Sequence, residues 1–435
     1  MKKVCTLLLL CVFVLTVAAC KSVDETSKEK EATTDAIGYY EGKIDIPNQP
    51  LGLEVTLQKK DGELSGTMSI PMQGLSDYPL STVEQKGENE LLFTMKIQNQ
   101  IISFEGKIDS DQIAGTFKQN NQAFPFQLTK AKKTIDAEGE FLQVETAYGT
   151  LSAEVKLPEG KRPYPVLLII PGSGQTDRDG NTVGMAGKNN SLKLLADGLA
   201  EQGIATIRYD KRGVKKNSQA ITKEEDMRLE QFVDDAVAFI DKLKTDDRFS
   251  TIGIIGHSQG SLVGMLAAQE QDIDAYISLA GLGRSIDQGL YDQLREQLPK
   301  KLLKESQDIL KSLTERKTVD EVSTELQAVF RPSVQPFLIS WMTYEPAAVI
   351  ADVKAPTLIV QGEHDLQVPA KEADLLYEAA ADAELLILEQ MNHVLKDAPK
   401  DREQNLATYT NPDLPLAKGL LEGIGDFLAQ NGFVK

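Results

Sequence analysis

A change of hydrophobic period on either side of a polar segment at Ala131–Gly139 constrains the fold more than any other feature of this chain. Before the segment, from about Tyr39 to Lys130, apolar and polar residues alternate, which is typical of half-buried strands. After it, short apolar runs alternate with stretches of helical period, which is typical of a parallel sheet covered by helices. We therefore expect an all-β domain over residues 37–130 and an α/β domain over residues 140–435.

The sequence of the first domain predicts an antiparallel meander. Lys60-Asp61-Gly62 separates the alternating segments Leu51–Gln58 and Glu63–Ile70, and Asp-Gly is a strong signal for a hairpin turn. Further alternating segments follow at Leu91–Ile97, Ile101–Ile108, Gln112–Lys118 and Phe124–Thr129. Roughly seven or eight such strands would form a small barrel or sandwich. Glu41–Asp45 recurs as Glu105–Asp109, a repeat that we interpret as two similar hairpins rather than two ligand sites.

The second domain predicts a doubly wound sheet. A hairpin is expected at Phe141–Leu157, turning at Tyr148-Gly149, and helices at about Leu192–Gln202 and Leu229–Lys244. Buried strands are expected at Val166–Ile170, Ala205–Tyr209, Ile252–Ile255, Ala275–Leu279, Thr357–Val360 and Leu385–Leu388. In such a mostly parallel sheet, functional sites lie at the carboxyl ends of the strands.

Gly256-His257-Ser258-Gln259-Gly260 matches the G-x-S-x-G pattern of a nucleophile elbow. An apolar strand precedes it and a segment of helical spacing follows it, so the chain must turn sharply at Ser258. The two glycines would let neighbouring backbone pack closely without a Cβ clash. Ser258 is therefore the candidate nucleophile.

A serine nucleophile needs a general base, and histidine is the usual one. The chain has three histidines. His257 adjoins Ser258, so its side chain should project away from the carbonyl that Ser258 attacks. His364 could be an ordinary loop histidine, which leaves His393 as the candidate base.

The imidazole needs a carboxylate partner to fix its tautomer. Asp365 follows the predicted strand Thr357–Val360 at its carboxyl end and is the first choice, with Glu363 as the alternative. For the oxyanion hole we expect the backbone N–H of Gln259, the residue after the nucleophile, and that of Ser173, with Gly174 as the alternative to Ser173.

The motifs PGSGQTDRDGN, YDKRG, GHSQG, QGEHDLQVP and MNHVLK stand in an order that resembles the α/β-hydrolase superfamily. More narrowly, the chain is similar to exported bacterial EstD-like carboxylesterases that carry a β-rich domain before the hydrolase. The resemblance implies hydrolysis of short-chain acyl esters through an acyl-enzyme, with the triad Ser258, Asp365 and His393 and with no cofactor or metal. The alternatives are a serine peptidase of the same fold, or a surface ligand-binding lipoprotein whose hydrolase domain is dormant.

Three further segments of the second domain stand out in the sequence. Thr176–Asn181 is polar enough for a binding loop or for a salt-bridged structural loop, and Tyr209–Gly213 resembles a structural turn of the superfamily. Residues at about 282–348 form an insertion with helical period at Tyr291–Leu298, Leu302–Leu313 and Val319–Val329, which we interpret as a helical cap. Its Trp341 and Tyr344 are candidates for the substrate pocket, although core packing explains them equally well.

The N-terminus predicts export. A basic start at Met1-Lys2-Lys3 precedes the apolar run Val4–Val17, as in a signal peptide over residues 1–19. Val17-Ala18-Ala19-Cys20 resembles the bacterial lipobox, which implies acylation (diacylglycerol and palmitate) at Cys20 and anchoring in a bacterial cell-envelope membrane. The alternative is an ordinary secretory signal cut near Ala19. Residues 20–36 are polar and suit a flexible tether.

Composition narrows the partners and the chemistry. A net charge of −18 disfavours nucleic acid, whose phosphates an acidic surface repels. All three cysteines lie at Cys5, Cys11 and Cys20, so the folded part offers no thiol nucleophile, disulfide or cysteine metal site.

Overall fold

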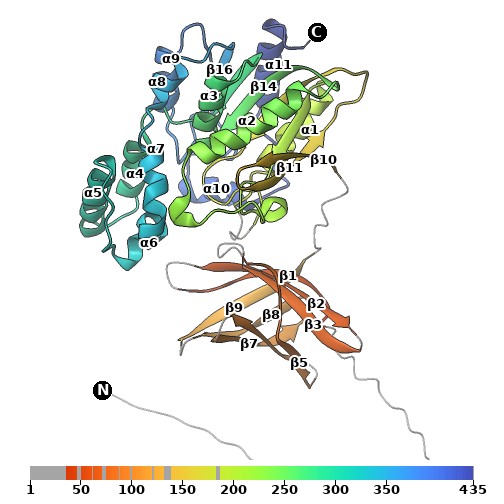
Figure 1. Cartoon of the computed structure of the whole chain (residues 1–435). Helices are drawn as coiled ribbons and strands as arrows, with labels where there is room; N and C mark the ends of the chain where they lie inside the picture. Colours follow the sequence, from red (N-terminus) through yellow and green to blue (C-terminus); the bar gives the residue numbers. More distant parts are fainter. Residues whose placement is uncertain are drawn as a thin grey trace, which may run out of the picture.

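A computed structural model describes residues 36–46, 50–60, 62–70, 75–87, 89–97, 100–119, 122–131, 139–182 and 187–434 (Figure 1). The predicted signal peptide, the acylation at Cys20 and all but the last residue of the predicted tether lie outside the described residues. Two separate sheets are described, one on each side of residues 132–138.

The first sheet is antiparallel with the strand order β4-β3-β2-β1-β9-β8-β7-β6-β5. Its strands are β1 Gly38–Ile44, β2 Leu51–Lys60, β3 Glu63–Ile70, β4 Leu75–Pro79, β5 Thr82–Lys86, β6 Glu90–Ile97, β7 Gln100–Asp109, β8 Gln112–Gln119 and β9 Gln122–Ala131. β4 and β5 stand at opposite ends of this order, yet only two residues, Leu80 and Ser81, connect them. The sheet must therefore curl until its edges approach, because two residues span only about 7 Å. The result is a half-barrel.

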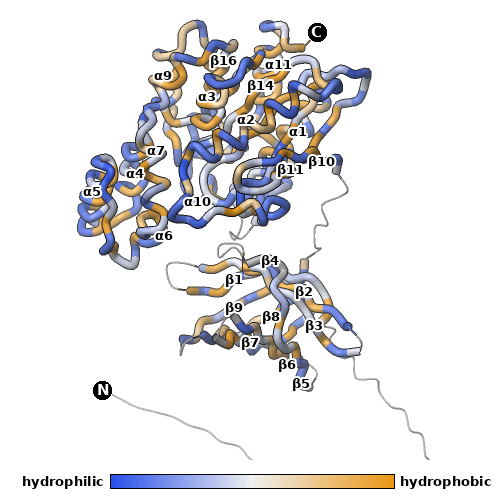
Figure 2. Tube along the Cα trace, in the orientation of Figure 1, coloured by the Kyte–Doolittle hydropathy of each residue, from blue (hydrophilic) through white to orange (hydrophobic). Residues whose placement is uncertain are grey.

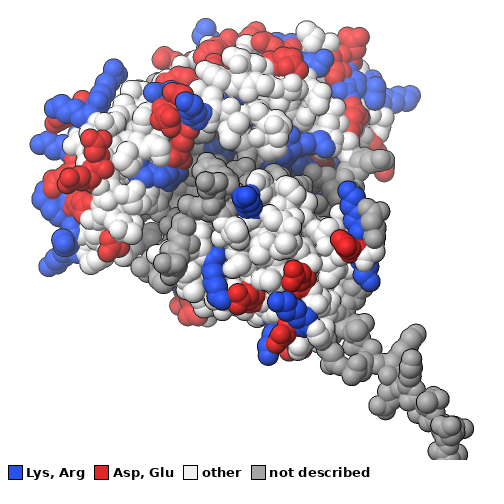
Figure 3. Space-filling model, turned by 60° about the horizontal axis from the view of Figure 1, so that its bottom comes forward, with Lys and Arg blue, Asp and Glu red and all other residues white. Residues whose placement is uncertain are grey.

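The curled sheet encloses an aromatic core. Phe93 and Phe104 stack with ring centroids 4.8 Å apart, and Phe126 meets both rings edge-on. Glycines permit the curl: a Cβ on Gly42 would lie 1.9 Å from the Gln127 carbonyl oxygen, and one on Gly115 would lie 2.0 Å from that of Glu105. On the face seen in Figure 3, basic side chains are interspersed with acidic ones.

The nine described strands exceed the predicted seven or eight. Three strands, β1, β4 and β5, are not among the predicted segments. β4 and β5 are only five residues each and β1 contains two glycines, so hydrophobic alternation marks them weakly. The hairpin between β2 and β3 is confirmed, with Gly62 at φ +88° in its turn.

The second sheet has the order β10-β11-β13-β12-β14-β15-β16-β17. β11 pairs antiparallel with β10 and β13, and the remaining pairs are parallel. The strands are β10 Glu140–Thr146, β11 Gly149–Lys156, β12 Tyr164–Ile170, β13 Ala205–Tyr209, β14 Phe249–His257, β15 Ala275–Leu279, β16 Thr357–Gly362 and β17 Glu384–Leu388. The predicted α/β fold, with an initial hairpin and a mostly parallel sheet, is confirmed.

Helices cover both faces of this sheet. α1 Ser191–Glu201 and α11 Leu420–Gln430 share one apolar core with one face, while α2 Glu230–Lys244, α3 Gln259–Glu270 and α9 Lys371–Ala379 share another core with the opposite face. α2 illustrates the cause, because its buried residues Phe232, Ala236, Phe239 and Leu243 recur at helical spacing. The trace of β14 in the middle of this sheet is mostly hydrophobic (Figure 2). No helix among the described residues is long and apolar enough to cross a bilayer.

The insertion after β15 contains α4 Ile286–Arg295, α5 Lys300–Thr314, α6 Gln327–Phe330, α7 Gln335–Trp341 and α8 Pro346–Ile350. The prediction of a helix over Val319–Val329 is wrong: only a short 3-10 turn at Thr324–Leu326 and α6 are helical there. Side chains replace the helical bonds, because Gln335 accepts from the Val319 N–H and Glu305 accepts from the Ser323 N–H.

Candidate active site

Ser258 occupies a strained turn between β14 and α3. Its φ of 56° and ψ of −119° are unfavourable for a residue with a side chain. The flanking glycines are required, because a Cβ on Gly256 would lie 2.2 Å from the Gly260 carbonyl oxygen and one on Gly260 would lie 2.3 Å from that of Ile170. The G-x-S-x-G spacing therefore forms the predicted elbow, and Ser258 lines a cavity beside it.

Asp365 and His393 are brought together at the carboxyl end of β16. His393 Nδ1 lies 2.8 Å from Asp365 Oδ2. The other carboxylate oxygen of Asp365 accepts the backbone N–H groups of Gln367 and Val368 at 2.7 and 2.8 Å. Glu363, the alternative acid, is exposed, and its carboxylate forms no hydrogen bond with His393 in the described part of the chain. Asp365 is therefore the partner of this imidazole.

His257 connects the elbow to the loop that carries His393. Its Nε2 lies 2.8 Å from the carbonyl oxygen of His393, and the two rings are 5.0 Å apart. A carbonyl oxygen only accepts, so Nε2 of His257 carries the proton. Burial, helped by the neighbouring His393, lowers the pKa of His257 to about 4, which keeps this donor neutral.

Ser258 directly follows His257, which contacts His393. Among the described residues no hydrogen bond joins the Ser258 hydroxyl to His393. Such bonds are often long in unliganded enzymes and tighten when substrate binds. Side-chain hydrogen bonds also hold the loop of His393. The buried Asn392 amide donates to Asn405 Oδ1 at 3.0 Å and to Thr408 Oγ1 at 2.7 Å.

The two predicted oxyanion donors lie beside the elbow. Gln259 begins α3, where backbone N–H groups lack helical partners. Ser173 lies in the loop after β12, and a Cβ on the preceding Gly172 would lie 3.3 Å from Ser258 Cβ. Neither the Gln259 N–H nor the Ser173 N–H has a backbone acceptor in the described ranges, and both residues line the cavity.

Comparison with known proteins indicates a serine hydrolase. The family model described as "Serine aminopeptidase, S33" (Hydrolase_4) matches residues 182–397, a range that includes Ser258, Asp365 and His393. Over 319 residues the chain is 24% identical to Esterase EstD of Thermotoga maritima, covering 70% of this chain and 71% of that protein. The second domain has the α/β-hydrolase fold. It is a serine hydrolase distantly related to esterases.

Solved structures similar to this hydrolase include two esterases. Est1E from Butyrivibrio proteoclasticus is 20% identical, with a TM-score of 0.45 and coverage of 68% of this chain and 99% of that chain. The esterase domain from a Rhodothermus marinus protein is 17% identical, with a TM-score of 0.42 and the same coverage.

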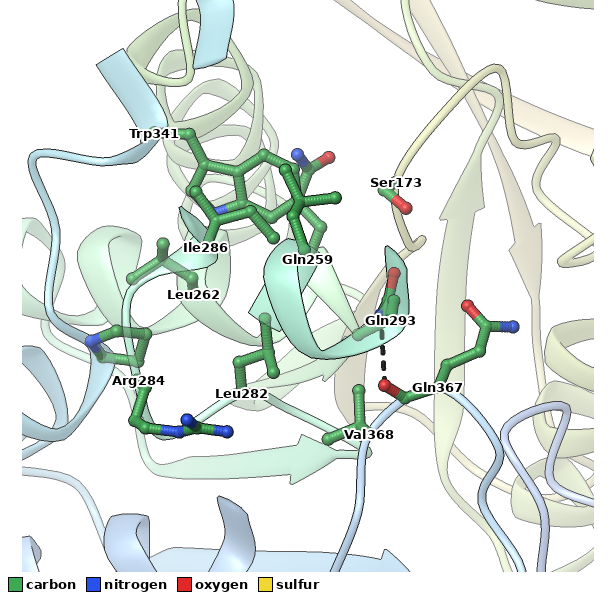
Figure 4. A pocket seen from close by; sticks show the side chains of 13 residues that line it. Ser173, Gln259, Leu262, Leu282, Arg284, Ile286, Gln293, Trp341, Gln367 and Val368 are labelled. Atoms are coloured by element: carbon green, nitrogen blue, oxygen red, sulfur yellow. Dashed lines mark hydrogen bonds between the residues drawn. The ribbon is translucent and has the colours of Figure 1, made fainter. Parts of the chain in front are cut away.

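The cavity of the hydrolase beside Ser258 is small, with a volume of about 100 Å³, and both apolar and polar side chains line it (Figure 4). It is lined by Ser173, Ser258, Gln259, Leu262, Leu282, Arg284, Ile286, Leu290, Gln293, Trp341, Pro346, Gln367 and Val368. Ile286 and Leu290 come from α4 and Trp341 from the end of α7, so the insertion forms part of the wall. Gln293 of α4 donates to the Gln367 carbonyl oxygen at 3.1 Å and ties the insertion to the Asp365 loop.

Of the two aromatic residues predicted for the pocket, only Trp341 lines it. Tyr344 is not among the residues that line the cavity. Its hydroxyl donates to Glu230 of α2 at 2.8 Å and so connects the insertion to α2. This placement corrects the prediction for Tyr344.

The polar loop Thr176–Asn181 is structural. Arg178 donates to Glu154 at 2.7 Å and to Asp210 at 2.8 Å, and the Arg178 side chain is buried. His364 is likewise structural, with Nδ1 2.5 Å from the Ala398 carbonyl oxygen. Within the described ranges no group of three or more His, Cys, Asp or Glu side chains could hold a metal ion.

Sequence reasoning missed Lys211, which follows β13 in the turn Tyr209–Gly213. Its Nζ donates to the Gly172 carbonyl oxygen at 3.0 Å and to Gln259 Oε1 at 2.8 Å. The motif resembled a structural turn, and nothing local to it points to residues 39 and 48 positions away.

Proposed function

We propose that this hydrolase is a carboxylesterase that cleaves short-chain acyl esters through an acyl-enzyme, with Ser258 as nucleophile, His393 as general base and Asp365 as its acid partner. The observation that carries the proposal is a strained serine that lines a small cavity and directly follows His257, which contacts the loop of an imidazole paired with a buried carboxylate.

The chemistry follows from these positions. His393 Nε2 takes the proton of the Ser258 hydroxyl while Oγ attacks the ester carbonyl carbon. The backbone N–H groups of Gln259 and Ser173 stabilise the oxyanion that develops. The alcohol leaves with the proton returned by His393, and a water activated by the same imidazole then releases the acid.

The cavity supports a short acyl group. Its volume of about 100 Å³ is smaller than an engineered cavity of about 150 Å³ that accommodates benzene. Leu262, Ile286 and Trp341 contribute apolar walls suited to an alkyl chain. A chain much longer than butyryl would have to displace one of these side chains.

The description of the matching family model makes an aminopeptidase the second candidate. Such an enzyme needs a carboxylate to hold the substrate ammonium. The charged residue that lines the cavity is instead a cation, Arg284, whose guanidinium donates to Glu372 and Asp292. No Asp or Glu is among the lining residues within the described ranges, which favours the ester.

The test is hydrolysis of p-nitrophenyl esters from acetate to dodecanoate by the full-length protein, alongside Ser258→Ala. We expect turnover of acetate and butyrate, falling steeply beyond hexanoate, and a loss of at least about 1,000-fold in kcat for Ser258→Ala. Turnover of aminoacyl p-nitroanilides in place of every ester would identify the peptidase. Activity retained by Ser258→Ala would remove Ser258 as the nucleophile.

A further inference from the structure

The side chain of Lys211 links the two segments that supply the predicted oxyanion donors. One of its hydrogen bonds goes to the carbonyl oxygen of Gly172, the residue before Ser173, and the other to the side chain of Gln259. Its own backbone N–H donates to the Thr176 carbonyl oxygen at 3.2 Å, further along the same loop. Lys211 therefore holds the oxyanion loop and the start of α3 at once.

The bond to Gly172 acts on the donor itself. The Gly172 carbonyl and the Ser173 N–H belong to one peptide unit, and in a planar trans peptide these groups point in opposite directions. A donor fixed on the Gly172 oxygen therefore aims the Ser173 N–H away from Lys211. Hydrogen bonds in series also polarise one another, so the bond from Lys211 to the Gly172 oxygen strengthens the Ser173 N–H as a donor.

The placement of Lys211 is costly for stability. The residue is 6% exposed, and Nζ lies 4.3 Å from the centre of the Phe232 ring. Burial lowers the pKa of Lys211 to about 7, with Asp235 of α2 acting in the opposite direction. Asp235 is itself in an ion pair with the adjacent Arg212, and no ion pair to Lys211 occurs in the described part of the chain. A buried amine bonded to neutral oxygens is more typical of a functional site than of a stabilising contact.

We propose that Lys211 is a positioning residue of the hydrolytic site, which orients the Gly172–Ser173 peptide and Gln259 so that their N–H groups converge on the oxyanion. This inference rests on the proposed acyl transfer at Ser258. Lys211 touches neither the substrate nor the nucleophile and acts through the donors. Its effect should therefore appear in the transition state and not in substrate binding.

The test compares Lys211→Met, which keeps the stem and removes the donor, with Lys211→Gln, which keeps a shorter donor. The matched control is Lys216→Met. Lys216 is an exposed lysine five residues further along the chain, and its Nζ lies 4.1 Å from the centre of the Phe141 ring. We would measure kcat and KM on the best ester, the inhibition constant of an alkyl boronic acid that forms a tetrahedral adduct, and Tm.

We expect Lys211→Met to lower kcat about 10- to 100-fold while KM stays within about twofold of the wild-type value. The inhibition constant of the boronic acid should rise by a factor similar to the loss in kcat. Lys211→Gln should recover part of both losses, and Lys216→Met should match the wild type. Unchanged kcat and boronate affinity in a folded Lys211→Met would overturn the proposal, as would a loss confined to KM. If Lys211→Met does not fold, the same criteria apply to Lys211→Gln. Wild-type turnover decides the esterase proposal separately, whereas the ratio of variant to wild type decides this one.

Discussion

At the scale of residues, the position of His393 depends on two buried neighbours with different tasks. Asp365 holds the ring through Nδ1, and His257 holds the backbone through the His393 carbonyl oxygen. These contacts involve different groups of His393, so each has its own test.

Removing the charge of Asp365 tests the acid assignment. Asp365→Asn keeps an oxygen for the Gln367 and Val368 N–H groups but cannot stabilise an imidazolium, so kcat should fall about 10,000-fold. The control is Glu363→Gln, which should retain wild-type kcat. If the two variants exchange these behaviours in the ester assay, Glu363 is the acid.

His257 should make folding sensitive to acid. Its pKa falls from 6.5 to about 4 on folding, so between about pH 6.5 and pH 4 this histidine is protonated in the unfolded chain and neutral in the native state. The free energy of unfolding therefore falls by about 3 kcal/mol as the pH is lowered from 6.5 to about 4, and it does not change from this cause above pH 6.5.

Urea unfolding of wild type and His257→Gln at pH 7 and pH 4.5 measures this contribution. The glutamine keeps a donor toward His393 but cannot titrate. We therefore expect the variant to lose about 2 kcal/mol less stability over this interval than the wild type. Equal losses would show that His257 does not contribute to the acid sensitivity.

At the scale of elements, local sequence predicts those that repeat a simple pattern. β3, β13 and β15 begin and end at the predicted residues, because alternating or continuous apolar runs between turn residues leave few alternatives. The segment Val319–Val329 shows the limit: its apolar spacing fits a helix, but side chains of Gln335 and Glu305 satisfy its backbone in another conformation.

The α7 element should set the acyl chain length through Trp341. Trp341→Leu enlarges the cavity and should raise the ratio of kcat/KM for octanoate over acetate about 10-fold. Tyr344→Phe is the control, because Tyr344 lies outside the cavity and its variant should keep the wild-type profile. A profile that changes in Tyr344→Phe but not in Trp341→Leu would place the acyl site elsewhere.

At the scale of the whole molecule, the half-barrel and the hydrolase domain each have their own core. An ion pair joins them, with Lys188 Nζ of the hydrolase domain 3.3 Å from Glu41 Oε1 of the half-barrel. The hydrolase carries the complete candidate site, so the half-barrel is not needed to supply a proposed site residue.

The location of the molecule depends on Cys20, and we propose that this residue carries the lipid anchor. In bacterial cells fed labelled palmitate, the wild type should be labelled and should sediment with membranes, whereas Cys20→Ser should lose both properties. Cys11→Ser, which changes a cysteine inside the apolar run, is the control and should behave as the wild type. An unlabelled wild type recovered as a soluble exported protein would indicate an ordinary signal peptide instead.

The sequence alone determined the two fold classes, the elbow at Ser258 and the choice of His393 among three histidines. These follow from neighbours a few residues apart and from which side chains can do the chemistry. Only the tertiary structure decided between Asp365 and Glu363 as the partner of His393. It also showed that Tyr344 bonds to α2 and that Lys211 bonds to Gly172 and Gln259. Those contacts join residues far apart in the chain, and their geometry depends on how whole elements pack, which the local periodicity of a sequence does not record.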